Sequence, residues 1–150
     1  MQPTRPLVAL AFSGGLDTSY CVPRLADDGW AVETVFVNTG GTTAQDREAI
    51  RRQAEAVGAR RHHEVDARTA VFERFVRFLI QGNVLRGAVY PLSVAAERTQ
   101  QAIGVIEAAR AMGATAVAHG STGAGNDQVR FDVAFRVLAP ELQILTPIRE

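Results

Sequence analysis

Short apolar runs alternate with longer amphipathic stretches along this chain, and the two patterns predict strands and helices in turn. A short continuous apolar run bounded by turn residues is typical of a strand that is buried on both faces. We expect such strands over residues 7–12, 31–37, 115–119 and 142–145, and a shorter one over 62–66. The chain therefore predicts about five short strands.

Between these strands, apolar residues recur every three or four positions, which is the spacing of one buried helix face. We expect helices over residues 18–28, 44–57 and 71–80, a long one that ends at Gly113, and one over 131–138. In the third of these helices, the stripe expected to face the core consists of Phe72, Phe75, Val76 and Leu79.

This alternation predicts an α/β fold with a parallel sheet of about five strands and helices on both faces, as in Rossmann-like domains. In such sheets, ligands bind beyond the carboxyl ends of the strands. The segments that follow those ends are 13–19, 37–41 and 119–127. These three loops should therefore converge on one cleft.

The composition narrows the class of protein. The 150 residues suggest one domain, and 16 arginines balance 16 acidic residues, so neither nucleic acid nor a membrane is expected as a partner. The single Cys21 excludes an internal disulfide and is expected to be a buried thiol. Residues 1–6 contain no apolar leader and no stretch approaches membrane-spanning length, so we expect a cytoplasmic protein.

The heptapeptide Ser13-Gly14-Gly15-Leu16-Asp17-Thr18-Ser19 joins the first strand to the first helix. Two glycines let the backbone turn so that successive N–H groups face one concavity, and the helix start adds donors and a partial positive charge. The loop is therefore predicted to hold a pyrophosphate group. A Walker-type loop is excluded, because it requires a lysine and the chain contains none. The alternative is an ordinary Gly-Gly turn.

A second glycine-rich segment, residues 118–131, follows the fourth strand. Within it, Asn126 or Asp127 is expected to cap the next helix, and Arg130 lies about one turn further on. An amide, a carboxylate and a guanidinium so close together suit a zwitterion, with its ammonium on Asp127 and its carboxylate on Arg130 or Thr122. That combination favours an amino acid as ligand. The alternative is a capped helix with a surface ion pair.

The histidines are not predicted to carry chemistry. His62 and His63 are neighbours on a strand, where adjacent side chains point to opposite faces, so a charged edge is favoured over a metal pair. His119 lies in the cleft segment and is expected to pack or hydrogen-bond there instead of acting as a base. No metal site is predicted.

The segments 11–19 and 119–131, at this separation, resemble the argininosuccinate synthase family, and the similarity runs through essentially the whole chain, including Tyr90-Pro91-Leu92 and Ile148-Arg149-Glu150. The first motif is shared with other ATP pyrophosphatases, whereas the second is highly specific. The resemblance implies a nucleotide-binding domain of the adenine nucleotide alpha hydrolase type over residues 1–150. It also implies a second synthetase and oligomerisation domain, absent from this chain, and a homotetrameric full-length form.

The resemblance further implies a two-step ligase reaction of arginine biosynthesis. The ureido oxygen of citrulline attacks the α-phosphate of ATP, giving citrullyl-AMP and pyrophosphate, and the amino group of aspartate then displaces AMP to give argininosuccinate. Mg²⁺ is expected to arrive with the ATP. Because a neutral ureido oxygen is a weak nucleophile, catalysis should come from alignment and charge stabilisation.

Carried over position by position, the resemblance assigns three sets of residues. The implied ATP-binding residues are Ala11, Phe12, Ser13, Gly14, Gly15, Leu16, Asp17, Thr18, Ser19, Val37 and Gly120. The implied aspartate-binding residues are Thr122, Asn126 and Asp127, and the implied citrulline-binding residues are Tyr90, Asn126 and Arg130. Asp127 is also the candidate catalytic residue, which would orient or deprotonate the aspartate amine.

Two positions depart from the family pattern, which has a lysine where Ala124 stands and a serine where Ala95 stands. Because that serine is a citrulline contact, one alternative is a related adenylating ligase with a different ureido or carboxylate acceptor. A second alternative is an isolated ATP-binding module without turnover.

Overall fold

The computed structural model describes residues 5–149 and contains the expected parallel sheet. The strands follow the order β3-β2-β1-β6-β7. Their bounds are Leu7–Ala11 for β1, Ala31–Asn38 for β2, Arg61–Asp66 for β3, Ala116–Ala118 for β6 and Gln143–Leu145 for β7. Each strand end lies within one residue of its expected position, so the prediction of a five-stranded α/β fold is confirmed.

The helices also follow the expected order, with two differences. Their bounds are Leu16–Asp27 for α1, Ala44–Ala56 for α2, Arg68–Val71 for α3, Arg77–Gln81 for α4, Ser93–Met112 for α5 and Asp127–Leu138 for α6. The expected helix over 71–80 is interrupted by a π-helical turn, η1, at Phe72–Val76. A short antiparallel ribbon of β4, Leu85–Arg86, and β5, Tyr90–Pro91, was not expected.

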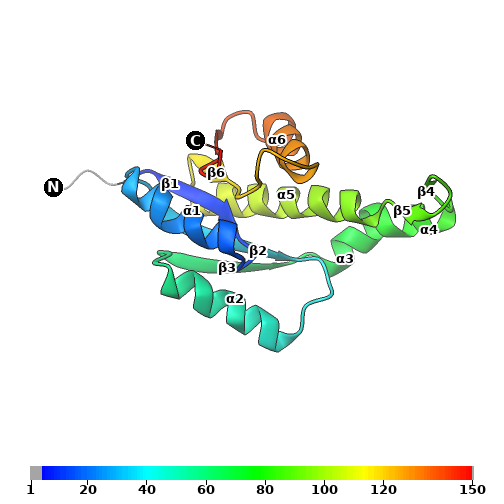
Figure 1. Cartoon of the computed structure of the whole chain (residues 1–150), viewed down its shortest axis with the longest axis horizontal. Helices are drawn as coiled ribbons and strands as arrows, with labels where there is room; N and C mark the ends of the chain where they lie inside the picture. Colours follow the sequence, from blue (N-terminus) through cyan, green and yellow to red (C-terminus); the bar gives the residue numbers. More distant parts are fainter. Residues whose placement is uncertain (1–4, 150) are drawn as a thin grey trace.

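Helices cover both faces of the sheet, with α1 and α2 on one side and α5 and α6 on the other (Figure 1). The alternation along β1 explains this arrangement, because successive side chains of a strand point to opposite faces. Val8 and Leu10 pack with Cys21 of α1, whereas Ala9 packs with Val105 of α5. Cys21 is the buried thiol that was predicted, and burial raises its pKa to about 11.

The strand order places a topological switch point beside β1. The chain runs outward from β1 through β2 to β3, returns along α5, and then adds β6 on the other side of β1 and β7 beyond it. The connections on the two sides of β1 therefore leave in opposite directions, which opens a crevice at the carboxyl ends of β1 and β6.

Residues 72–91, which we call the arm, comprise η1, α4, β4 and β5 and extend past the end of the sheet alongside the first turns of α5 (Figure 1). The prediction that the Phe72 stripe faces the core is wrong. Phe72 is 47% exposed, and Phe75, Val76 and Leu79 are only half-buried. The physical reason is that η1 packs mainly against α3, α4 and α5, and none of its main contacts is with a strand of the sheet.

Within residues 5–149, no helix is both long and apolar enough to span a bilayer. The expectations for residues 1–4 and for the similarity at Glu150 lie outside the described part of the chain.

Candidate functional site

A cavity of about 420 Å³ lies at the carboxyl ends of β1, β2 and β6, where the three loops were expected to meet. The predicted site residues that line it are Ala11, Phe12, Ser13, Gly15, Leu16, Asp17, Thr18, Val37, Gly120, Thr122, Asn126 and Asp127. The loops after β1 and β6 therefore meet at one cavity as predicted, whereas of residues 37–41 only Val37, near the end of β2, lines it.

The loop between β1 and α1 is held in shape by its own hydroxyl groups. The Ser13 Oγ and Thr18 Oγ1 atoms lie 3.2 Å apart, the Gly15 N–H donates to Ser13 Oγ, and Thr18 Oγ1 donates to the Gly15 carbonyl. Gly15 occupies the N-cap of α1 without a side-chain cap, so the first-turn amides of the helix have no acceptor from the cap residue. An anion at this end of the cavity would meet those amides and the positive end of the helix dipole.

Two residues of the predicted ATP loop do not line the cavity but support it. Gly14 has φ +77°, and a Cβ there would lie 3.1 Å from Cγ1 of Ile50 in α2. The Ser19 side chain is buried and its Oγ accepts a hydrogen bond from Nε2 of Gln53. Helix α2 therefore packs against the loop at both positions, on the side away from the cavity.

Glycines also allow close packing on the other walls. A Cβ at Gly120 would lie 3.3 Å from the Thr18 backbone nitrogen, so the loop after β6 touches the start of α1. A Cβ at Gly104 of α5 would lie 2.9 Å from both Cγ atoms of Val37. The second approach seats α5 directly on the end of β2 and fixes one wall of the cavity.

Helix α5 forms a wall of the cavity that the sequence prediction largely missed. Arg98, Gln101 and Val105 line the space. The Arg98 Nη1 atom donates to Gln101 Oε1 at 2.7 Å, and Thr39 Oγ1 donates to Glu97 Oε1 at 2.7 Å. Gln101 Nε2 also contacts Glu97 Oε1 at 3.4 Å, so a chain of polar contacts runs from Thr39, in the loop after β2, along α5 to Arg98.

That polar chain ends on Asp127 at the start of α6. Arg98 Nε lies 3.2 Å from Asp127 Oδ2, and Arg130 Nη1 lies 2.8 Å from Asp127 Oδ1. Asn126 occupies the N-cap position, as predicted, but its side chain makes no capping hydrogen bond. The carboxylate and guanidinium proposed for a zwitterion are therefore together, and in this structure they bind each other.

His119 lies beneath the glycine-rich loop and is almost fully buried. Its Nδ1 accepts from the Ser121 N–H at 3.2 Å, its Nε2 lies 2.8 Å from Asp132 Oδ1, and its ring stacks on Phe131. The prediction that His119 packs and hydrogen-bonds is confirmed. Burial lowers its pKa despite the Asp132 carboxylate, so the ring is neutral at pH 7 and carries its proton on Nε2.

Arg149 links the His119–Asp132 pair to Gln128, which contacts the glycine-rich loop. It contacts both carboxylate oxygens of Asp132 at 3.0 Å and donates to Gln128 Oε1 at 3.0 Å. Gln128 Nε2 in turn donates to the Gly123 carbonyl at 2.6 Å. Although partial burial alone would raise the pKa of Asp132, the hydrogen bonds from Arg149 and His119 lower it. The glycine-rich loop after β6 is thus bonded to α6 at two points, through His119 and Asp132 and through Gly123 and Gln128.

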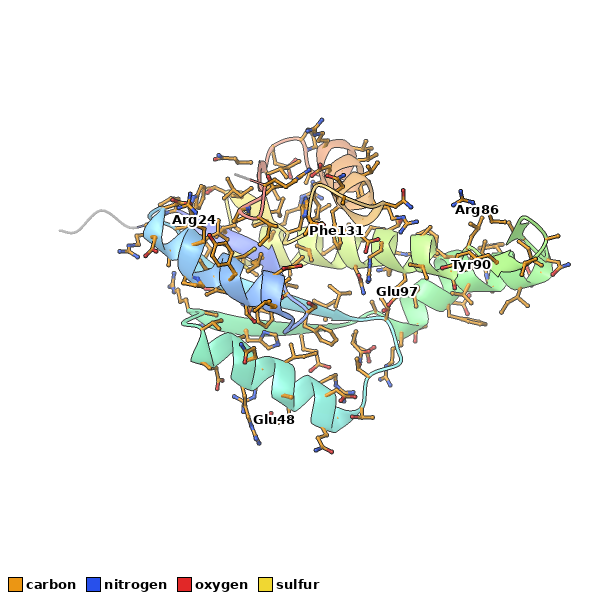
Figure 2. All side chains as sticks on the ribbon, in the orientation of Figure 1. Arg24, Glu48, Arg86, Tyr90, Glu97 and Phe131 are labelled. Atoms are coloured by element: carbon orange, nitrogen blue, oxygen red, sulfur yellow. The ribbon has the colours of Figure 1, made fainter. Side chains whose placement is uncertain are left out.

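Tyr90 and Arg130 do not line this cavity. Tyr90 is 52% exposed on β5 of the arm, and Figure 2 shows it well away from Phe131. Arg130 reaches the site only through Asp127 and borders a second, apolar groove that also includes Val129 and Val133 of α6. Most of the ATP-side residues and all of the aspartate-side residues thus line one cavity, whereas of the predicted citrulline-side residues only Asn126 does.

His62 and His63 lie on opposite faces of β3, as predicted. His62 Nδ1 lies 2.9 Å from Thr34 Oγ1, and His63 Nε2 lies 2.7 Å from the buried Glu33 carboxylate. Burial lowers the pKa of His62. Across residues 5–149, no group of three or more His, Cys, Asp and Glu side chains is arranged to hold a metal ion.

The chain is similar in sequence to proteins of one family. The family model described as the arginosuccinate synthase N-terminal HUP domain matches residues 7–150. Argininosuccinate synthase of Xanthomonas axonopodis pv. citri is 46% identical over 95% of this chain and 34% of its own length. That of Synechococcus sp. WH7803 is 47% identical over 95% of this chain and 36% of its own length. The chain thus spans about a third of the length of these relatives.

Solved structures of other proteins share the fold at low sequence identity. A predicted tRNA methyltransferase subunit of Methanocaldococcus jannaschii has a TM-score of 0.61 and 17% identity, covering 96% of this chain and 68% of its own. Glutamine-dependent NAD+ synthetase of Acinetobacter baumannii, in complex with ADP, has a TM-score of 0.62 and 15% identity, covering 87% of this chain and 24% of its own. These likenesses support the fold alone.

Proposed function

The chain belongs to the argininosuccinate synthase family, and from that membership we propose that it forms the ATP-binding part of a ligase that joins citrulline to aspartate. The reaction consumes ATP and releases AMP, pyrophosphate and argininosuccinate, through a citrullyl-adenylate. Because the chain covers about a third of its relatives, the remaining length would supply the rest of the amino-acid sites.

The single observation that supports this proposal most strongly is the cavity itself. It brings the loop after β1 and the loop after β6 together, and these are the two segments most typical of the family. The Gly120 backbone packs against the start of α1, so a triphosphate on the α1 amides would place its α-phosphate near the loop that carries Asp127. Such proximity is what an adenylation step requires, because aligned reactants lower the barrier by about 7–11 kcal/mol.

We assign the residues of the cavity to roles on this basis. The first-turn amides of α1, with Ser13 and Thr18 shaping the loop, would bind the outer two phosphates and stabilise the departing pyrophosphate. Val37 would contact the adenine side. Thr122, Asn126 and Asp127 would bind aspartate, with Asp127 accepting its ammonium, while Arg130 and Asn126 would face citrulline.

Charge on the phosphates must be neutralised mainly by something other than lysine. The chain contains no lysine, and Ala124 stands in the cavity wall where the family has one. We therefore propose that Mg²⁺ enters with the nucleotide and supplies the missing positive charge.

Tyr90 is assigned to citrulline by the family pattern alone. Its position on the arm means that it would serve the reaction only if citrulline extends beyond the cavity or the arm closes over it. A different acceptor is favoured by one observation, the alanine at position 95. An ATP–pyrophosphate exchange assay with a panel of ureido and carboxylate compounds distinguishes citrulline from other acceptors.

The nucleotide assignment is tested by calorimetric titration of the chain with Mg-ATP. We expect saturable binding that Gly14→Val abolishes, because the valine would meet Ile50 and would have to adopt φ +77°. Circular dichroism of the variant controls for loss of the fold. An unchanged affinity in a folded Gly14→Val variant would rule out this loop as the nucleotide site.

The ligase assignment is tested separately by measuring pyrophosphate release in the presence of ATP, citrulline and aspartate. We expect release over repeated turnovers of the full-length form to depend on both amino acids, because aspartate is needed to consume the adenylate. Binding of ATP by the 150-residue chain without pyrophosphate release would favour the isolated ATP-binding module, whereas release with another acceptor would favour the related ligase.

A further inference from the structure

His119 occupies a buried position from which its ring reaches the backbone of the loop that follows β6. The residue comes directly after that strand and is only 1% exposed. Its ring stacks on Phe131, with 5.5 Å between the ring centroids, and its backbone N–H donates to the Leu145 carbonyl of β7. Both the backbone and the side chain of His119 are therefore fixed by the core.

The two ring nitrogens of His119 have different partners. Nε2 lies 2.8 Å from Asp132 Oδ1, and Arg149 contacts both oxygens of that carboxylate at 3.0 Å. Nδ1 accepts a hydrogen bond from the Ser121 N–H at 3.2 Å. Because an ionised carboxylate only accepts and an amide N–H only donates, this arrangement requires a proton on Nε2 and a free lone pair on Nδ1.

The hydrogen bond to Nδ1 closes a short turn around Gly120. The ring belongs to residue 119 and the donor to residue 121, so Gly120 is held by both of its neighbours. A Cβ on Gly120 would lie 3.3 Å from the Thr18 backbone nitrogen, so this turn lies directly against the first turn of α1. Gly120 and Ser121 both line the cavity. The position of this wall relative to the α1 amides therefore depends on the His119 ring.

We propose that His119 is a positioning residue for nucleotide binding, whose neutral Nδ1 holds Ser121 so that Gly120 stays against the start of α1. This role rests on the proposed function and deepens it, because it identifies what holds one wall at the phosphate end of the cavity. His119 acts through the Ser121 amide and not on the nucleotide itself. Asp132 and Arg149 act one step further away, since they orient the ring.

A proton on Nδ1 would remove the acceptor on which this role depends. The ring would then carry an N–H that faces the Ser121 N–H, and because two donors repel each other the turn would move away from α1. Asp132 favours the protonated ring and Arg149 opposes it, while burial lowers the pKa and keeps the ring neutral at pH 7. The other charged side chains that line the cavity are Asp17, Arg98 and Asp127.

Two substitutions separate the role of Nδ1 from that of Nε2. Asparagine places an amide oxygen near the position of Nδ1, whereas glutamine places its amide near the position of Nε2. At pH 7.5 we expect His119→Asn to bind Mg-ATP within about threefold of the unmodified chain, and His119→Gln to bind about tenfold more weakly. A purely structural role predicts the opposite order, because glutamine fills more of the ring's volume and keeps a bond to Asp132. Calorimetric titration measures the affinities, and circular dichroism checks the fold of each variant.

The pH dependence of Mg-ATP binding is the second readout. The affinity of the unmodified chain, divided by that of His119→Asn, should fall at least twofold from pH 7.5 to pH 5, because asparagine does not titrate. Taking this ratio cancels the protonation of the nucleotide itself. His63→Asn is the matched control, since the His63 ring is bonded to Glu33 and does not line the cavity. Its affinity should follow that of the unmodified chain at every pH.

The unmodified chain supplies a third test that does not depend on the folding of a variant. Nitrogen chemical shifts of the imidazole at pH 7.5 should show a proton on Nε2 of His119 and none on Nδ1. The reverse tautomer would overturn the role of His119, as would a folded His119→Gln variant that binds Mg-ATP as tightly as His119→Asn, or an affinity ratio that does not change with pH. Each of these results, obtained with saturable Mg-ATP binding, would leave the proposed nucleotide site intact. Failure of the unmodified chain to bind Mg-ATP would instead overturn the proposed function, and the role of His119 with it.

Discussion

The sheet with its cavity and the arm of residues 72–91 show the same helical spacing of apolar residues with opposite results. On α6, Phe131 and Phe135 are buried against the sheet and stack around His119. On the arm, Phe72, Phe75 and Val76 repeat this kind of spacing, yet Phe72 is about half exposed and Phe75 and Val76 are only partly buried. A periodic apolar stripe therefore indicates a helix reliably, but it does not indicate what covers that helix.

The difference has consequences for both stability and function. Residues packed on both faces of the sheet unfold with the whole domain, whereas segments with few buried contacts open locally at lower free energy. The cavity belongs to the firmly packed part of the domain, because Arg98 and Asp127 come from α5 and α6, the helices that pack on the sheet. Tyr90 lies on the arm, whose apolar side chains are largely exposed.

The largest expected effect comes from truncating one phenylalanine in each region. Phe135→Ala should lower the free energy of unfolding by about 3–5 kcal/mol, because it leaves a cavity in the closed core. Phe78→Ala removes a half-exposed ring that lies 4.6 Å from the Arg77 guanidinium and should cost about 1 kcal/mol or less. Urea unfolding measures both. Equal losses would mean that the arm is as firmly packed as the core.

A smaller effect is expected from adding a methyl group inside the cavity region. Gly120→Ala should weaken Mg-ATP binding about tenfold, because the new Cβ lies 3.3 Å from backbone atoms of Asp17 and Thr18 and pushes the loop away from α1. Gly123→Ala is the matched control, since a Cβ there meets nothing within 4 Å. Calorimetric titration compares the two variants. Similar affinities would show that contact between the two loops is not needed for nucleotide binding.

A pH titration should report on the sheet region alone, because all three histidines lie outside the arm. Burial lowers the pKa of His119 below its ordinary value of 6.5, so below about pH 6.5 the unfolded chain binds a proton that the folded chain excludes. The free energy of unfolding should therefore fall as the pH is lowered from 7.5 to 5. His119→Asn should flatten this dependence, leaving the part due to His62, whose pKa is also lowered by burial.

Phe78→Ala serves as the control for this titration, because residues 72–91 contain no histidine. Its curve should run parallel to that of the unmodified chain. A His119→Asn curve that is also parallel would contradict the neutral, buried state of His119.

The smallest expected effect is a gain of stability confined to the arm. Ala88 has φ +59°, a left-handed conformation that costs an alanine about 1 kcal/mol and costs glycine almost nothing. Ala88→Gly should therefore slow amide hydrogen exchange in residues 72–91 while leaving the urea midpoint of the whole domain unchanged. A shift of that midpoint would show that the arm unfolds together with the sheet.

The sequence alone determined the order of elements and the position of the glycine turn at residues 13–19. Strand runs, helical spacing and the Ser13–Ser19 turn are local patterns, because each depends on residues a few positions apart. The meeting of the loops after β1 and β6 also followed from sequence, since the carboxyl ends of parallel strands must lie at one edge of the sheet. The position of His119 directly after a predicted buried strand likewise indicated that it would pack or hydrogen-bond there.

Only the tertiary structure decided what stands around Asp127 and what covers each helix. Arg98 meets Asp127 across 29 positions of sequence, and that contact depends on how α5 crosses the sheet, which Gly104 and Val37 allow by their close approach. The exposure of the arm, the buried position of Ser19 and the location of Tyr90 depend in the same way on packing between distant elements. Local patterns fix backbone conformation, but the surroundings of a side chain are set by segments whose relative placement no local pattern encodes.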